Sequence, residues 1–104
     1  MITEKEKCIA NELDKILQSE VEPGGYSIAG SIPFDGIFMY KEENKWIVAD
    51  VSRGRIYRYL GEFQEIFLAS LFCINMLIPH NQIGEVQKRF CEILHQNVPG
   101  FNNY

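Results

Sequence analysis

The stretch IFMYKEENKWIVADVSRGRIYRYL, residues 37–60, contains three runs rich in apolar and β-branched residues, separated by two turn sequences. The runs are Ile37–Lys41, Trp46–Val51 and Arg55–Leu60. EENK at 42–45 and SRG at 52–54 have the polar and glycine residues of hairpin turns, and Gly54 is free to adopt a positive φ. The stretch therefore predicts an antiparallel meander with Trp46–Val51 at its centre.

The last run alternates in a way that predicts its two faces. Tyr57 and Tyr59 are two residues apart and should share one face, whereas Ile56, Arg58 and Leu60 should share the other. A weaker strand is expected within GYSIAGSIPFDG, residues 25–36, although Pro33 argues against a central position in a sheet. The meander should thus have three to four strands.

Helical patterns flank the meander on both sides. Thr3 and Glu6 have the spacing of a capping box, and a helix is predicted from Glu4 to Ser19 before EPGG ends it. Gly61 should end the sheet, with Glu62 and Glu65 near the positive end of the next helix dipole. The two further predicted helices are Phe63–Leu77 and Gln82–Gln96. The first of these two is apolar almost all round, which predicts that it packs on the sheet as the centre of an α+β core.

Composition fits a single globular domain spanning residues 1–104. The chain is 46% hydrophobic and 23% charged and has a net charge of −4, which argues against direct binding to nucleic acid. Residues 1–50 hold ten acidic and five basic residues, whereas residues 51–104 hold four and five. An acidic surface of this kind suits a basic partner.

Compartment is indicated by the cysteines and by the apolar segments. The longest apolar-rich run, Ile66–Ile78, is shorter than the roughly 20 residues that cross a bilayer, and the charged N-terminus has no signal-peptide pattern. Cys8, Cys73 and Cys91 are odd in number and widely spaced, which fits free thiols in a reducing compartment. We therefore expect a cytoplasmic protein that does not associate with membranes.

Few residues suggest chemistry. His80 and His95 do not have the spacing of a metal site, so no metal or cofactor is predicted. Arg53, Arg55 and Arg58 are either a solvated hairpin or a phosphate-binding patch. Asp50 on the central strand either pairs with one of them across the hairpin or is a recognition acid on an exposed sheet edge. Four aromatic residues on adjacent strands form either core or a binding patch; they are Tyr40, Trp46, Tyr57 and Tyr59.

The segment GIFMYKEENKWIVADVSRGRIYRYLGEFQEIFLASLFCINML, residues 36–77, resembles small immunity proteins of bacterial polymorphic-toxin and contact-dependent inhibition systems. The resemblance rests on Glu42-Glu43, on Trp46, on Arg53-Gly54 and on the helix after Gly61. Many members have an acidic residue before the Arg-Gly pair, where this chain has Ser52.

The resemblance implies an inhibitor without enzymatic activity, which binds a basic toxin domain such as a nuclease and covers its active site. It implies a monomer in a 1:1 complex rather than a homodimer. The expected partner-binding residues are Asp35, Glu42, Glu43, Arg53 and Tyr57.

Two other classes of function remain open. A small acidic secretion chaperone would use a sheet surface to hold an effector segment, but it would need strands between the last two helices. A small enzyme would combine His80 with Arg53 or Arg58 on a phosphate ester.

Overall fold

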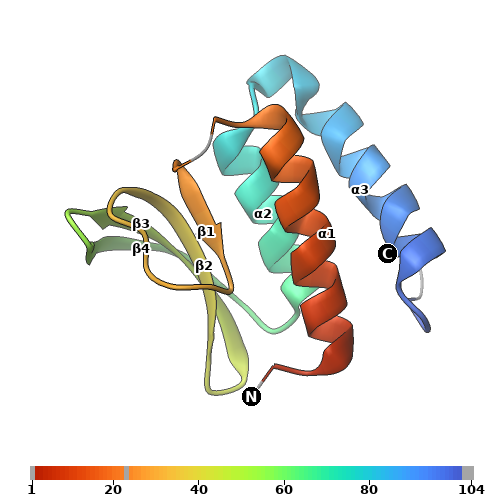
Figure 1. Cartoon of the computed structure of the whole chain (residues 1–104), viewed down its shortest axis with the longest axis horizontal. Coiled ribbons are helices and arrows are strands. Elements are labelled where there is room, and N and C mark those ends of the chain that lie inside the picture. The colour runs from red at the N-terminus through yellow and green to blue at the C-terminus, as the bar shows by residue number, and fades with distance from the viewer. Residues whose placement is uncertain (1, 23, 102–104) are drawn as a thin grey trace.

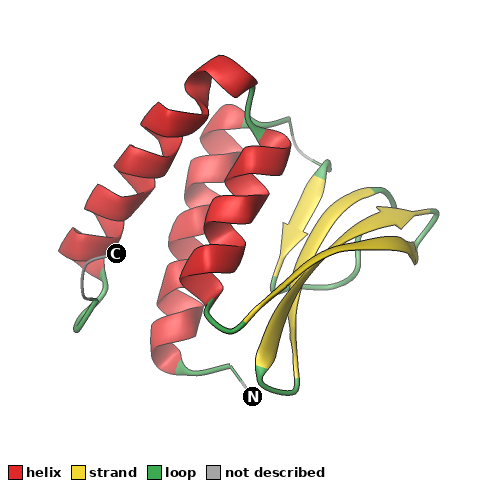
Figure 2. Ribbon diagram, turned by 180° about the vertical axis from the view of Figure 1, so that it is seen from behind, coloured by secondary structure: helices red, strands yellow, loops and turns green. Residues whose placement is uncertain are grey.

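The computed structural model describes residues 2–22 and 24–101, which form a mixed sheet covered on one face by helices (Figures 1 and 2). The elements in chain order are α1 (Glu4–Glu20), β1 (Tyr26–Ile28), β2 (Gly36–Glu42), β3 (Lys45–Ser52), β4 (Arg55–Phe63), α2 (Ile66–Leu77), the 3-10 turn η1 (His80–Gln82) and α3 (Ile83–Asn97). The predicted α+β class and the order helix, strands, helix, helix are confirmed.

The sheet has the strand order β1-β2-β3-β4, and its first pair differs from the prediction. β2–β3 and β3–β4 are antiparallel, as a meander requires, but β1 runs parallel to β2. Ile28, the last residue of β1, lies opposite Met39 in the middle of β2. The chain therefore returns through residues 29–35 to the far end of the sheet before β2 begins, instead of turning back as a hairpin.

The parallel junction depends on a close contact between two glycine backbones. The amide of Ile37 donates to the carbonyl of Gly25 at 3.1 Å, and Gly36 has a φ of 114°. A Cβ at Gly36 would lie 2.2 Å from the Gly25 oxygen. Only glycine fits at this position, because both the dihedral angle and the contact exclude a side chain.

β4 is longer and less regular than predicted. Gly61 and Glu62 belong to the strand rather than to a helix start, and the helix begins at Ile66 instead of Phe63. Phe63 pairs with Trp46 across the sheet and packs against Phe72 at a ring distance of 5.3 Å, which holds the strand in place to its last residue.

Two register shifts between β3 and β4 correct the predicted alternation. Ile56 lies opposite Val51, Tyr59 opposite Ala49, and Arg58 opposite Asp50. Ile56 and Tyr59 therefore both pair with residues that lie on the same face of β3. A strand without bulges would place Ile56 and Tyr59 on opposite faces. A bulged strand cannot keep the period of two that the prediction assumed.

The helices form two layers on one side of the sheet (Figures 1 and 2). α2 contacts β2, β3 and β4, which confirms that it packs on the sheet, and α3 packs outside it against α1 and α2. The largest fully buried side chains come from all layers; they are Trp46, Phe90, Leu13, Leu17, Met39, Ile74, Leu94 and Val48. Within the described part of the chain, no helix has both the length and the apolar character needed to span a membrane.

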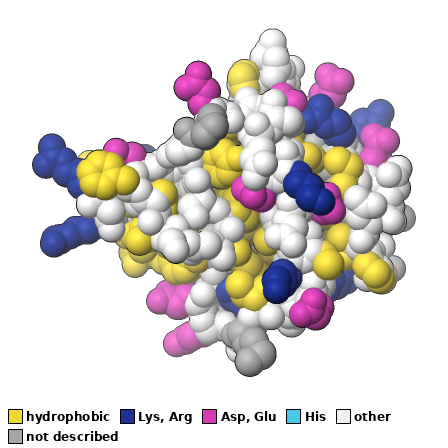
Figure 3. Space-filling view, in the orientation of Figure 1, with side chains coloured by type: hydrophobic (Ala, Val, Ile, Leu, Met, Phe, Trp, Pro, Cys, Tyr) yellow, Lys and Arg dark blue, Asp and Glu magenta, His cyan; other side chains and the backbone are white. Residues whose placement is uncertain are grey.

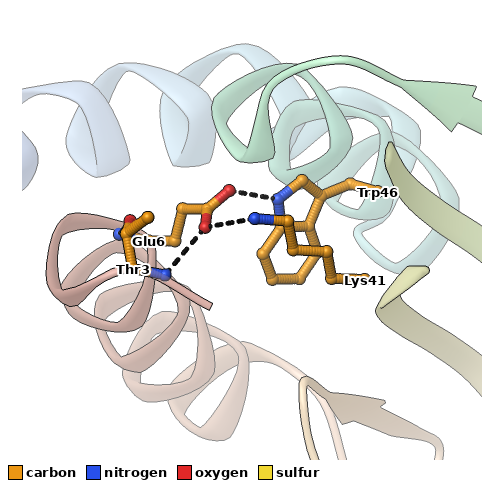
Figure 4. A network of polar contacts seen from close by, with 4 residues as sticks. All are labelled: Thr3, Glu6, Lys41 and Trp46. Carbon is orange, nitrogen blue, oxygen red and sulfur yellow. Dashed lines mark hydrogen bonds and ion pairs between the residues drawn. The ribbon is translucent and has the colours of Figure 1, made fainter. Parts of the chain in front are cut away.

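One carboxylate joins the start of α1 to the sheet (Figure 4). Glu6 and Thr3 form the predicted capping box, with distances of 2.9 and 3.1 Å between each amide and the other side chain. Glu6 also accepts hydrogen bonds from Lys41 at 2.8 Å and from the indole of Trp46 at 2.7 Å. Partial burial favours the neutral acid, but the bonds from Lys41, Thr3 and Trp46 outweigh it and lower the pKa of Glu6 from 4.5 to about 2.

We predict that Glu6 makes the stability of the fold sensitive to acid. Its contribution of about 3 kcal/mol is complete above pH 4.5 and is lost as the pH falls toward 2, because the unfolded carboxyl binds its proton first. Glu6→Gln should lower the free energy of unfolding at pH 7 by about 2–3 kcal/mol and flatten the decline between pH 5 and pH 3. Urea titrations at several pH values would measure this. Glu4→Gln in the same exposed turn is the matched control, and equal acid profiles for the two variants would contradict the prediction.

A second prediction concerns the junction between β1 and β2. Gly36→Ala should lower the free energy of unfolding by about 3 kcal/mol or more, since it adds a backbone clash to a dihedral angle that alanine rarely adopts. Gly84→Ala is the control, because a Cβ there meets no atom within 4 Å and the residue is exposed in α3. Thermal and urea unfolding should separate the two variants, and a Gly36→Ala protein as stable as the native chain would refute this account.

Candidate functional site

The sheet face opposite the helices carries an apolar surface, which we call the open face. It consists of Phe38, Tyr40, Ile47, Ala49, Val51 and Tyr59, on the side of the strands opposite the helix-facing residues Ile37, Met39, Trp46 and Val48. The rings of Phe38 and Tyr40 stack with centroids 4.7 Å apart. Burial, together with the neighbouring Tyr59, raises the pKa of Tyr40 to about 12, so this hydroxyl stays protonated in the physiological range.

The loop of residues 29–35 lies on the same side as the open face. Ser27, which points away from the helices because it pairs with Phe38, donates its hydroxyl to the carbonyl of Ser31 at 2.8 Å. At its far end the loop meets the turn between β3 and β4. The amide of Gly54 donates to the carbonyl of Phe34 at 2.7 Å, and the amide of Arg53 donates to Asp35 at 3.1 Å.

The β3–β4 turn is fixed by these two bonds and by its own geometry. Arg53 and Gly54 are its two central residues, with φ values of 54° and 77°. Positive φ at both central positions is the pattern of a two-residue hairpin turn. Two segments that are 18 residues apart in sequence therefore form one ordered end of the sheet.

This end of the sheet, which we call the tip, gathers the most exposed aromatic rings among the described residues. Phe34 and Tyr57 are 69% and 74% exposed, and Tyr59, farther along β4 opposite Ala49, is 65% exposed. Arg53 and Arg55 flank Gly54 in the same turn, whereas Arg58 lies opposite Asp50, on the other face of β4 from Tyr59. Figure 3 shows Lys and Arg side chains projecting beside hydrophobic side chains at the left-hand end of the molecule, where Figure 1 places the β3–β4 turn.

Some charged side chains at the tip form ion pairs and others do not. Arg58 pairs with Asp50 at 3.4 Å, which confirms the predicted ion pair across the hairpin. Asp35 accepts the Arg53 amide. Neither the Arg53 nor the Arg55 side chain takes part in an ion pair within residues 2–22 and 24–101.

The five residues predicted to bind a partner are divided between the two ends of the sheet. Asp35, Arg53 and Tyr57 lie at the tip, whereas Glu42 and Glu43 lie at the β2–β3 turn. Six residue steps along β2 separate these ends, which is about 20 Å. Glu42 and Glu62 border a shallow hollow of about 480 Å³ that also contacts Ile47 and Tyr59. The predicted set therefore does not form one compact site.

Sequence reasoning missed Phe34, and it did not separate the aromatic residues of the core from those exposed on the surface. Trp46 is core, Tyr40 is half-buried, and Tyr57 and Tyr59 are exposed. Phe34 stands between Pro33 and Asp35 in a turn-forming loop, and a large apolar residue in such a segment is the signal that could have identified it.

The histidines and cysteines occupy separate places. His95 packs edge-on against Phe101 at 5.0 Å, in agreement with a structural role, and His80 is exposed in η1. Burial raises the pKa of the Cys73 thiol to about 12, which makes it unreactive at neutral pH. The described residues contain no group of three or more His, Cys, Asp or Glu that could hold a metal ion.

Comparison of the chain with models of known protein families, with curated proteins and with solved structures gives no match. Its function therefore has to be argued from the residues and from the geometry of the tip and the open face.

Proposed function

We propose that this protein acts by binding another protein, as an inhibitor of the immunity type that neutralises a bacterial toxin domain by covering its active site. The observation that carries the proposal is the tip, where the exposed rings of Phe34 and Tyr57 lie on the same two hydrogen-bonded segments as Arg53 and Arg55. Tyrosine and arginine are among the residues most enriched at the energetic centres of protein interfaces.

The tip is suited to tight binding because its backbone is already ordered. The bonds from Gly54 to Phe34 and from Arg53 to Asp35 hold the loop against the turn at 2.7 and 3.1 Å. A surface that is ordered before binding loses less conformational entropy when the complex forms. The neighbouring open face extends this surface along the sheet with apolar and aromatic residues.

The charge of the protein supports a basic partner. The net charge of −4 produces an attractive field around a toxin nuclease, which needs positive charge to hold nucleic acid. Glu42 and Glu43 are exposed at the β2–β3 turn and take part in no ion pair within the described segments. They are the residues proposed to guide the encounter, while the tip supplies the final contacts.

The two alternative functions have less support. A chaperone of the secretion type would need strands between α2 and α3, and the described residues there form only η1. A phosphate-ester enzyme would need His80 beside Arg53 or Arg58, but η1 follows the end of α2 at the top of Figure 1, whereas the β3–β4 turn lies at its left-hand end.

Co-expression with a toxic neighbour tests the proposal. We expect that the product of the adjacent upstream gene inhibits growth when it is expressed alone, that this chain restores growth, and that the two proteins elute as a 1:1 complex in gel filtration. Tyr57→Ser should weaken the complex by at least about tenfold, because it removes an exposed ring from the tip. Equal growth inhibition with and without this chain, and no complex, would overturn the proposal.

The acidic turn gives a separate kinetic prediction. Reversing charge at Glu42 and Glu43 to arginine should slow association with the toxin about tenfold at low salt and by much less at high salt, because screening removes long-range attraction. Reversing Glu85 and Glu92, which are exposed on α3, is the matched control with the same change in net charge. Stopped-flow fluorescence would measure both rates, and equal rates for the two variants would exclude Glu42 and Glu43 from the encounter surface.

A further inference from the structure

The tip carries a positive charge that the attraction of a basic partner does not explain. The chain as a whole is acidic, yet Arg53 and Arg55 stand close together in the hairpin without an ion pair in the described part of the chain. Among the described residues, Asp50 pairs with Arg58, and Asp35 accepts the Arg53 backbone amide but forms no ion pair with either arginine side chain. Two cations are therefore available at the tip.

The position of Arg53 is costly for the backbone. Its φ of 54° is a conformation that glycine, asparagine and aspartate adopt far more readily than arginine. Asparagine suits this dihedral angle better than arginine, so the turn itself does not require the arginine side chain. Backbone strain that a fold does not need is a reason to look for a use of the side chain.

We propose that the tip binds an acidic segment of a protein partner. Arg53 and Arg55 pair with carboxylates of that segment, and the rings of Phe34 and Tyr57 contact its apolar side chains. Guanidinium groups bind carboxylates through two parallel hydrogen bonds, which gives geometric specificity in addition to charge attraction. This inference rests on the proposed function, because it assigns the chemistry of the surface that the inhibitor recognises.

An acidic segment is compatible with a partner that is basic overall. A metal-dependent nuclease holds its ions with carboxylates at the centre of a surface that is otherwise positive. The acidic surface of the rest of this protein attracts the positive surface of such a nuclease, and the arginines of the tip pair with the carboxylates at the centre of that surface. A single-stranded nucleic acid is disfavoured as the occupant, because two free cations on a chain of net charge −4 give little counterion release.

Peptide display on the complete chain tests the inference even before a toxin partner has been identified. Random twelve-residue peptides selected on the wild-type protein should be enriched in Asp and Glu, with aromatic or aliphatic residues among them. Their affinity should fall at least tenfold in Arg53→Asn/Arg55→Thr. This variant keeps its fold, because asparagine suits the positive φ and threonine suits the strand. Lys7→Ser/Lys88→Ser removes two exposed helix charges and should leave the affinity unchanged.

Several results would overturn the inference. Selected peptides without an acidic excess, or with equal affinity for both double variants, would exclude an acidic segment. A fluorescent single-stranded RNA, twelve uridines long, that binds more tightly than the peptides and depends on Arg53 and Arg55 would assign the tip to nucleic acid. Self-association lost in the arginine variant, measured by light scattering, would assign it to a second copy.

The growth assay separates this inference from the proposed function. If Tyr57→Ser abolishes protection but Arg53→Asn/Arg55→Thr does not, the inhibitor stands and the acidic segment is refuted. If acidic peptides bind in an arginine-dependent way but no toxin is neutralised, the acidic-segment surface stands and the immunity function fails.

Discussion

The arrangement of the two halves of this protein depends on the partly buried carboxylate of Glu6. It caps α1 through Thr3 and accepts hydrogen bonds from Lys41 and Trp46, which are 35 and 40 residues away in sequence. The helix start, β2 and β3 are thereby held at one point. Three donors around one acid keep it ionised despite partial burial, which is why its pKa is lowered to about 2. With α1 fixed, α2 can lie across the sheet and α3 can close the helical side.

The helices of the described chain cover only one face of the sheet and leave the other face without a helical layer. The helix-facing residues of β2 and β3 belong to the main core, whereas Phe38, Ile47, Ala49 and Val51 are buried on the open face among their own neighbours and outside that core. Because this apolar cluster on the open face is small, the side chains at its edge stay exposed to solvent. Tyr59 is exposed beside this cluster in the middle of the sheet, and the exposed rings of Phe34 and Tyr57 lie at the tip.

The two ends of the sheet have opposite electrostatic character. The β2–β3 turn carries Glu42 and Glu43, and the β3–β4 turn carries Arg53 and Arg55, about 20 Å away along the strands. A partner that lies along the open face meets both charges and so has a preferred orientation. In the function proposed above, the net charge of −4 attracts a basic partner from a distance and the arginines of the tip pair with its carboxylates.

The sequence by itself determined the α+β class, the capping box, the central strand, both hairpins and the covering of the sheet by α2, because periodicity and turn chemistry are local. It also indicated an ion pair between Asp50 and one of the hairpin arginines, and the strand register selected Arg58 as the partner.

Tertiary structure alone decided the parallel direction of β1, the bulges of β4 and the bonds that Glu6 accepts from Lys41 and Trp46. It also decided that Phe34 joins Tyr57 at the tip while Glu42 lies at the opposite end. These features depend on contacts between segments far apart in the chain, and no local pattern of residues encodes such contacts.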